Sequence, residues 1–171
     1  TMSQPKANSP ANQYDVVVIG GGPGGATLAA LLAQRGRRCL VLEQSQFPRY
    51  HIGESLVPHT HGIFERLEFL DKLKRSAFPE KHSVRFVPVD GGDATSFFFS
   101  WTIQGDGART WQVERSQFDR MMLDHAHELG VEVRHGVTVE KVVFEGNQAT
   151  GVVASNGTEK HTIEAKVVVD A

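Results

Sequence analysis

The chain has 171 residues, of which 40% are hydrophobic, and it carries a formal net charge of -2 with a pI near 6.4. These values are typical of a globular protein with a sizeable core, and they exclude the basic surface that a nucleic-acid-binding protein needs. No apolar run approaches the ~20 residues that cross a bilayer, so we expect no stable membrane anchor. The single cysteine, Cys39, has no disulfide partner in the chain, and no signal peptide is recognised, so the sequence predicts a cytoplasmic protein.

Residues 1–13 are polar, contain Pro5 and Pro10, and are predicted to be a disordered tail. A first apolar strand is then predicted over Tyr14 to Ile19, and a helix from Pro23 to Arg35 with Gly36 as its C-terminal cap. A second strand follows from Arg37 to Leu42. The three elements make a βαβ unit with parallel strands and a right-handed crossover.

The turn between the first strand and the helix has the spacing of a dinucleotide-binding site. Gly20, Gly22 and Gly25 form a GxGxxG pattern, which allows a tight turn, a close approach of ligand to backbone, and close packing of helix on strand. Pro23 suits the first helical turn, whose N–H groups and dipole attract phosphates. Glu43 lies at the end of the second strand, where an acidic residue binds a ribose hydroxyl and disfavours a 2′-phosphate. The pattern indicates FAD or NAD, and the alternative is a glycine-rich turn without a ligand.

The stretch from Gln44 to Pro58 contains two prolines and a glycine and is predicted to be a loop. It either lies near the cofactor or is an irregular surface connection. A helix is predicted from Thr60 to Lys74. Strands are predicted over residues 83–89, 96–101 and 110–113. Their aromatic residues form either ordinary sheet core or the wall of an aromatic substrate pocket.

Ser116 is predicted to cap a helix that ends near Leu129, and a short strand follows over Val131 to Val133. Alternating segments over residues 137–144, 149–155 and 158–163 predict an antiparallel β-meander laid over the main fold. Asn156 and Gly157 indicate a type I′ turn in it. Residues 166–171 are predicted to be one more buried strand that returns to the parallel sheet. The expected fold class is therefore α/β, and the histidines lack the spacing of a metal site, so no metal is expected.

The motifs together resemble those of the flavin-dependent halogenases and their relatives among flavoprotein monooxygenases and geranylgeranyl reductases. The stretches that carry the resemblance are VVVIGGGPGGATLAALLAQRGRRCLVLE, FPRYHIGESLVP, QVERSQFDRMMLDHA and VVVDA. Within that family the chain is most similar to enzymes that act on phenolic or pyrrolic groups, often tethered to a carrier protein. The resemblance implies a Rossmann-like FAD-binding fold over residues 14–171, which is incomplete, with residues 82–113 contributing strands to the sheet of a substrate domain.

The resemblance also implies that FAD fills the glycine-rich site, with Glu43 on the adenosine ribose and Arg115 beside the cofactor. Val139 falls where relatives let backbone atoms meet the adenine. The full set of implied cofactor-binding residues is Gly20, Gly22, Pro23, Gly24, Gly25, Glu43, Arg49, Ser55, Arg115, Val139 and Asp170.

Lys81 lies where halogenases of this type carry a catalytic lysine. The implied reaction uses FAD reduced by a separate flavin reductase, a flavin hydroperoxide, and chloride, which becomes hypochlorous acid that the lysine amine holds or converts to a chloramine near the aromatic substrate. The alternative interpretation of Lys81 is a solvated lysine after a helix.

Several signatures of the family are not found in these 171 residues. They are the Gly-Asp motif, the Trp-x-Trp-x-Ile-Pro signature and a second catalytic acid. We therefore expect the amino-terminal part of a halogenase. The alternatives are a monooxygenase, a geranylgeranyl-reductase-like enzyme, and an FAD-binding fragment without catalysis of its own.

Overall fold

The computed structural model describes residues 13–171, so the tail predicted for residues 1–13 lies outside the described residues except for Gln13. The described chain divides into two compact units. The first consists of residues 13–47 and 119–171, and the second of residues 48–118. Each unit is described by itself.

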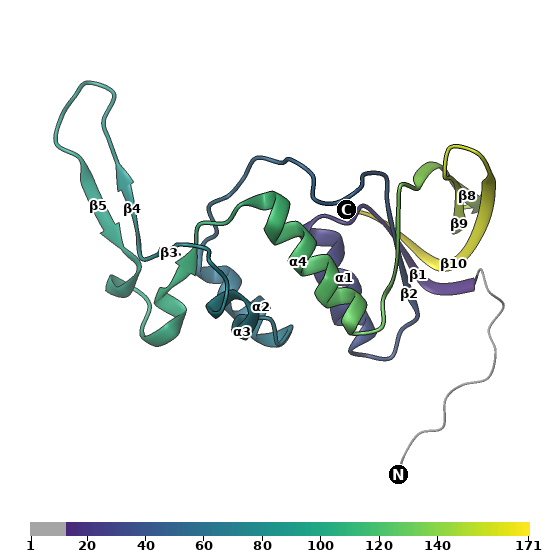
Figure 1. Ribbon diagram of the computed structural model, residues 1–171, viewed down its shortest axis with the longest axis horizontal. Helices are drawn as coiled ribbons and strands as arrows, with labels where there is room; N and C mark the ends of the chain where they lie inside the picture. Colours follow the sequence, from purple (N-terminus) through teal and green to yellow (C-terminus); the bar gives the residue numbers. More distant parts are fainter. Residues whose placement is uncertain (1–12) are drawn as a thin grey trace, which may run out of the picture. The chain divides into compact units, whose positions relative to one another are not determined.

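The first unit is built on one six-stranded sheet with the strand order β7-β2-β1-β10-β9-β8 (Figure 1). The strands are β1 (Gln13–Ile19), β2 (Cys39–Glu43), β7 (Glu132–His135), β8 (Thr138–Glu145), β9 (Gln148–Ser155) and β10 (Lys160–Asp170). Strands β7, β2, β1 and β10 pair in parallel, whereas β9 is antiparallel to both β10 and β8. The predicted βαβ unit and meander are confirmed, and together they form a single mixed sheet.

Helix α1 (Pro23–Ala33) joins β1 to β2, and helix α4 (Arg115–Glu128) precedes β7. The end of α1 is a Schellman motif, in which the N–H groups of Gly36 and Arg37 donate to Ala33 O and Leu32 O and Gly36 has a φ of 71°. The glycine cap was predicted from the sequence, and it is confirmed.

Each face of the sheet buries its own set of apolar side chains. On the face that α1 covers, Val18 lies close enough to Gly25 for its methyl group to be 3.1 Å from a Cβ added there. The other face is covered by the meander. Its core consists of Tyr14, Val17, Leu40, Leu42, Val152, Ala154, Ile163 and Ala165. The predicted alternation of the meander strands thus places their apolar side chains over the parallel strands.

Strand β10 combines two segments that the sequence analysis separated. Residues Lys160 to Glu164 pair antiparallel with β9, and residues Glu164 to Asp170 continue in parallel with β1. The prediction of two strands, 158–163 and 166–171, is therefore wrong. The turn before β10 spans residues 156–159, and Asn156 is not among the described residues with positive φ, so the type I′ assignment is also wrong.

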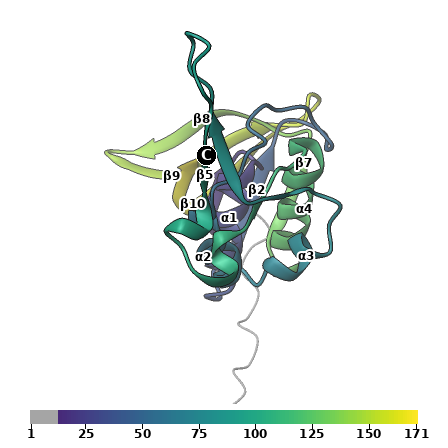
Figure 2. The same ribbon diagram turned by 90° about the vertical axis from the view of Figure 1, so that its left-hand side faces the viewer.

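The second unit contains short helices and two two-stranded ribbons. One ribbon, the β4–β5 hairpin, projects outward from the part of this unit that contains β3 (Figure 1). Figure 2 shows the same teal hairpin from the side. The elements are α2 (His61–Arg66), α3 (Leu70–Lys74), β3 (Glu80–Lys81), β4 (Ser83–Phe86), β5 (Thr95–Phe98) and β6 (Thr110–Trp111). Strand β3 pairs with β6, and β4 pairs with β5, both antiparallel.

The prediction of a single helix from Thr60 to Lys74 is wrong, because the helix is interrupted at Glu68, which has a φ of 59°. The N–H groups of Glu68 and Phe69 donate to Glu65 O and Phe64 O, so α2 ends in a Schellman motif with glutamate where glycine is usual. The break buries Phe69 completely, with its ring 5.8 Å from that of Phe64. Packing of the aromatic rings therefore overrides the helical periodicity.

Three further boundaries differ from the prediction. The expected strand 83–89 ends at Phe86, and the expected strand 96–101 turns into a 3-10 helix over Phe99–Trp101 that buries Phe99. The expected strand 110–113 has only two residues, Thr110 and Trp111. Ser116 does not cap α4, since the helix begins at Arg115 and the Ser116 hydroxyl donates to the Glu114 carboxylate.

Candidate functional site

The glycine-rich turn brings the ends of β1, α1 and β10 together in the first unit. Gly20 has a φ of 102°, and a Cβ added there would lie 2.2 Å from Ala171 O. A Cβ added to Gly25 would lie 2.1 Å from Gly20 O. Both contacts require glycine, one for the conformation of the turn and the other for the close packing of helix on strand.

The start of α1 is open to a ligand. Gly22 is the N-cap residue and makes no side-chain cap, and Pro23 follows in the first turn. A Cβ added to Gly24 would meet nothing within 4 Å. The first N–H groups of a helix have no partner within the helix, and the glycines around Pro23 put no side chain over this 11-residue helix's start, so this cradle fits a pyrophosphate.

Glu43 lies beside this cradle and is 4% exposed. Its Oε2 accepts a hydrogen bond from Gly21 N at 2.8 Å, and its Oε1 accepts one from Ser45 N at 2.8 Å. These bonds orient the carboxylate at the end of β2, beside the glycine turn.

Two other predicted cofactor residues belong to the same unit. Asp170 is exposed and pairs in register with Ile19, and Ala171 N donates to Ile19 O at 2.9 Å, so the end of β10 adjoins the glycine turn. Val139 lies on β8 and pairs with Ala154 of β9. Its side chain packs against the core of the meander face. An adenine contact from Val139 therefore has to come from its backbone.

Lys81 lies in the second unit, on β3, and its amine is held by three groups. Its Nζ donates to Ser55 Oγ at 2.5 Å and to Leu56 O at 3.3 Å, and it lies 5.5 Å from the centre of the Phe99 ring. Lys81 is half-buried, and Ser55 is exposed. Ser55 was predicted as a cofactor-binding residue, and no local signal predicted its bond to Lys81, because the two positions are 26 apart along the chain.

Arg115 and Arg49 are the remaining predicted residues of the second unit. Arg115 Nη1 donates to Ile52 O at 2.9 Å and lies 3.2 Å from a Cβ added to Gly53, whose φ is 106°. The guanidinium thus holds the loop before Ser55, which explains a cation in the first turn of a helix. Arg49 is half-buried in the segment that leads into this loop.

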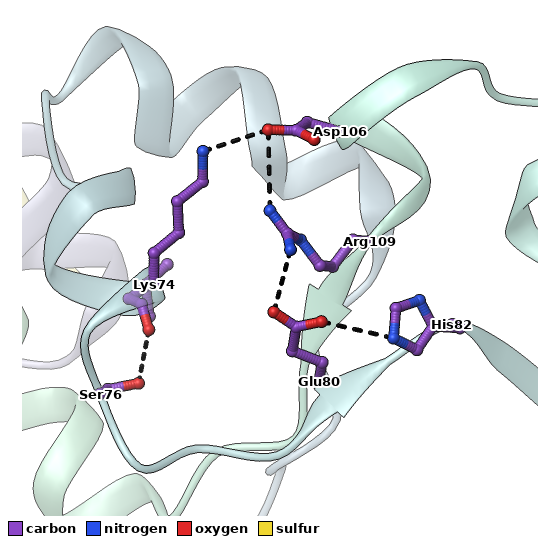
Figure 3. A network of polar contacts seen from close by, with 7 residues as sticks. Lys74, Ser76, Glu80, His82, Asp106 and Arg109 are labelled. Atoms are coloured by element: carbon purple, nitrogen blue, oxygen red, sulfur yellow. Dashed lines mark hydrogen bonds and ion pairs between the residues drawn. The ribbon is translucent and has the colours of Figure 1, made fainter.

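A network of charges includes Glu80 and His82, the two chain neighbours of Lys81 (Figure 3). Arg109 contacts Glu80 at 3.0 Å and Asp106 at 3.6 Å. Lys74 lies 3.1 Å from Asp106, and His82 lies 3.4 Å from Glu80. The hydrogen bond from Lys74, together with the charges of Lys74 and Arg109, lowers the pKa of Asp106. Because the flanking residues Glu80 and His82 both join the network, it fixes the strand on either side of Lys81.

The aromatic residues of the second unit divide between core and surface. Phe99 and Trp111 are buried, whereas Trp101 is 64% exposed and packs edge-on against Phe97 at 5.7 Å. A hollow of about 240 Å³ with a polar lining includes Ser100, which lies between Phe99 and Trp101 in the chain. It is formed by His82, Ser100, Gly105, Asp106, Ala108 and Arg109.

Within residues 13–171, no three His, Cys, Asp or Glu side chains gather closely enough to hold a metal ion. Over the same residues, no helix is long and apolar enough to cross a membrane.

Comparisons with known proteins agree along the whole described chain. The model of the FAD binding domain family matches residues 13–171. A 1H-pyrrole-2-carbonyl-[peptidyl-carrier protein] chlorinase of Pseudomonas fluorescens is 36% identical over 94% of this chain and 39% of its own length. A flavin-dependent halogenase of Armillaria mellea is 39% identical over 82% of this chain and 27% of its own length.

Solved structures show the same likeness. The myxobacterial chondrochloren halogenase has a TM-score of 0.89 and 41% identity, over 94% of this chain and 37% of that chain. The flavin-dependent brominase Bmp2 has a TM-score of 0.82 and 33% identity, over 93% of this chain and 38% of that chain. The chain thus spans about two fifths of the length of these two structures.

Proposed function

Because the chain belongs to the FAD binding domain family, we propose that it is the FAD-binding part of a flavin-dependent halogenase that acts on an electron-rich aromatic group. The observation that carries the proposal is the combination of that family with the held amine of Lys81. Relatives named as chlorinases, brominases and halogenases match almost the whole chain. We propose a phenolic or pyrrolic substrate, and the names of two relatives support one that is bound to a carrier protein.

The cradle at the start of α1 supports the binding of the FAD pyrophosphate by Gly20, Gly22, Pro23, Gly24 and Gly25. Glu43 accepts hydrogen bonds from the adenosine ribose in this proposal, and the backbone of Val139 meets the adenine. Asp170, Arg49, Ser55 and Arg115 complete the proposed set of cofactor contacts. FAD, reduced by a separate flavin reductase, would supply two electrons that bring oxygen to the peroxide level, and oxygen at that level would take two further electrons from chloride to give hypochlorous acid.

Lys81 is the proposed catalytic residue. An ammonium or amine can orient and polarise a small oxidant, and the Phe99 ring lies 5.5 Å from this amine. Its bonds to Ser55 and Leu56 use two of the three N–H donors of an ammonium. One donor remains to hold the hypochlorous acid next to the aromatic substrate.

We further propose that residues 14–171 form an incomplete FAD-binding domain and that residues 82–113 add strands to the sheet of a substrate domain. The β4–β5 hairpin supports this assignment, because Phe86 is 64% exposed and Phe98 is 44% exposed, and both would be covered by further strands. The buried free thiol of Cys39 is in keeping with a reducing cytoplasm.

The test is an assay of the full-length protein with a flavin reductase, chloride and carrier-bound pyrrole or free phenol substrates, with products identified by mass spectrometry. Chlorinated product is the expected result. Hydroxylated product alone would overturn the proposal in favour of a monooxygenase, and reduction of an isoprenoid double bond would favour a reductase of the geranylgeranyl type. A protein that binds no FAD would leave a module without catalysis of its own.

A further inference from the structure

We infer that Ser55 is a positioning residue, whose hydroxyl fixes the amine of Lys81 in its working place. This inference rests on the proposed function for its consequence in catalysis, but the contact itself is a property of the fold. Ser55 Oγ accepts a hydrogen bond from Lys81 Nζ at 2.5 Å, which is shorter than the bond of 3.3 Å from the same amine to Leu56 O.

The backbone around Ser55 is built to hold this distance. Ser55 forms an antiparallel bridge with Gln112, and on either side of it Leu56 N donates to Trp111 O at 3.1 Å and Val113 N donates to Glu54 O at 2.7 Å. The loop that carries Ser55 is therefore paired, as a strand would be, to residues 110–113, which contain β6 and are called the β6 segment below.

Lys81 lies on the opposite edge of the same segment. Its partner in the register is Thr110, and Gln112 N donates to Pro79 O at 2.9 Å. Residues two apart on a strand share a face, so Thr110 and Gln112 present their side chains on one face, with Lys81 beside Thr110 and Ser55 beside Gln112. Three paired segments thus place the hydroxyl and the amine next to each other across one strand.

We call the three paired segments, residues 54–56, 79–81 and 110–113, the platform. Buried side chains and ion pairs hold its other face. Trp111 and Val113 are each 1% exposed, and Arg109 joins Glu80 and Asp106 there. The platform can therefore resist the rotation that a free lysine side chain would undergo, since a lysine has four rotatable bonds and loses much entropy when it is fixed.

The chemistry of a hydroxyl suits a second contact. A serine hydroxyl accepts with its lone pairs and donates its own proton, so acceptance from Lys81 leaves the Ser55 proton available to a neighbour. If Ser55 also contacts the cofactor, as proposed above, one side chain connects the cofactor to the amine.

The first experiment measures the amine directly, in the full-length protein, without reference to catalysis. Reductive methylation by formaldehyde and cyanoborohydride is followed at each lysine by peptide mass spectrometry, in the wild type and in Ser55→Ala, Ser55→Thr and Ser100→Ala. We expect methylation of Lys81 to become roughly three- to tenfold faster in Ser55→Ala, because a charge-assisted hydrogen bond no longer holds the amine. The rate at Lys74 serves as the internal standard.

Ser55→Thr keeps the hydroxyl and should restore the slow rate, and Ser100→Ala removes an exposed serine of the same unit and should leave it unchanged. An unchanged rate at Lys81 in Ser55→Ala overturns the inference, as does an equal increase in Ser100→Ala. Should Ser55→Ala lose its FAD or its fold, Ser55→Cys offers a side chain of similar size that accepts hydrogen bonds poorly and is judged by the same criteria.

The second experiment addresses the consequence. In the chlorination assay, Ser55→Ala should lower kcat tenfold or more with little change in the KM for the aromatic substrate, and Ser55→Thr should recover most of kcat. A rise in KM alone would overturn the positioning role. If Lys81→Ala keeps full chlorination, the proposed function of Lys81 fails, whereas the methylation result still decides the inference about Ser55.

Discussion

The carbonyl oxygen of Gly20 lies 2.1 Å from the point that a Cβ on Gly25 would occupy. The first residue after β1 and the first turn of α1 are thus in direct backbone contact. This contact sets the distance of the helix from the sheet, and it leaves the start of the helix open at Gly24, where an added Cβ meets nothing within 4 Å.

We expect Gly25→Ala to destabilise the protein by at least about 1–3 kcal/mol, because the backbone of Gly20 cannot move aside as a flexible side chain would. Gly24→Ala is the matched control and should change the free energy of unfolding by less than about 0.5 kcal/mol. Urea unfolding followed by circular dichroism measures both. Equal effects of the two substitutions would contradict the packing argument. A loss of FAD affinity in the stably folded Gly24→Ala variant would support the phosphate cradle.

Glu43→Gln should weaken FAD binding about tenfold, because the carboxylate that accepts from Gly21 N and Ser45 N would present an amide N–H₂ to one of these donors. We also expect the free energy of unfolding to fall by about 1–2 kcal/mol. Isothermal titration with FAD and urea unfolding are the measurements. Glu145→Gln, on the exposed end of β8, is the control and should change neither quantity. Unaltered FAD affinity in Glu43→Gln would argue against the ribose contact.

Glu68→Gly should stabilise the protein by about 0.5–1 kcal/mol. Glu68 ends α2 with a φ of 59°, a conformation that costs an L-residue about 1–2 kcal/mol and a glycine almost nothing. The greater entropy of glycine in the unfolded chain offsets part of this gain. Glu65→Gly, within α2, is the control and should lower stability by about 1 kcal/mol. A loss of stability in Glu68→Gly, measured by thermal unfolding, would show that the side chain contributes more than the strain costs.

Alkaline pH should destabilise the first unit through its buried thiol. Burial, with a smaller contribution from the charge of Asp15, raises the pKa of Cys39 from 9.0 to about 11. A pKa raised by folding stabilises the folded state fully below the ordinary value, and this contribution is lost as pH rises through the folded value. We therefore expect the free energy of unfolding to fall between about pH 9 and about pH 11, by up to about 2–3 kcal/mol.

Cys39→Ala should reduce this alkaline loss, measured as the free energy of unfolding in urea at a series of pH values. Burial and the neighbouring Glu132 also raise the pKa of Tyr14, so a smaller loss should persist in the variant. An identical pH dependence in Cys39→Ala and the wild type would refute the role of the thiol.

Lys81→Ala should abolish chlorination by the full-length enzyme while FAD binding and the reduction of FAD continue. The reason is that the proposed role of the amine begins only after the oxidant has formed. Lys160→Ala is the control, since Lys160 pairs with Glu140 at the surface of the first unit, and it should retain activity. Chlorination and FAD absorbance are followed in parallel. Chlorination at the wild-type rate in Lys81→Ala would remove Lys81 from the mechanism.

The sequence predicted the first unit well because its signals are local. Apolar runs, a glycine at the end of α1 and the spacing of Gly20, Gly22 and Gly25 each act within a few residues, so β1, α1 and β2 could be assigned without any knowledge of packing. The same holds for Glu43, whose place at the end of β2 follows from the strand itself.

Only the tertiary structure decided the points that depend on contacts between distant residues. Phe69 is buried among rings from other segments, and this packing breaks the expected helix at Glu68 although the sequence keeps a helical period. Pairing with β9 at one end and β1 at the other makes β10 a single strand.

The bond between Ser55 and Lys81 is of the same kind. Each residue lies in a short segment with no regular period of its own, and both become neighbours because their backbones pair with opposite edges of the β6 segment. The sequence by itself therefore determined the fold class and the glycine-rich turn, through local conformational preferences. The position of the lysine amine was decided by pairing between segments far apart in the chain, which no local preference encodes.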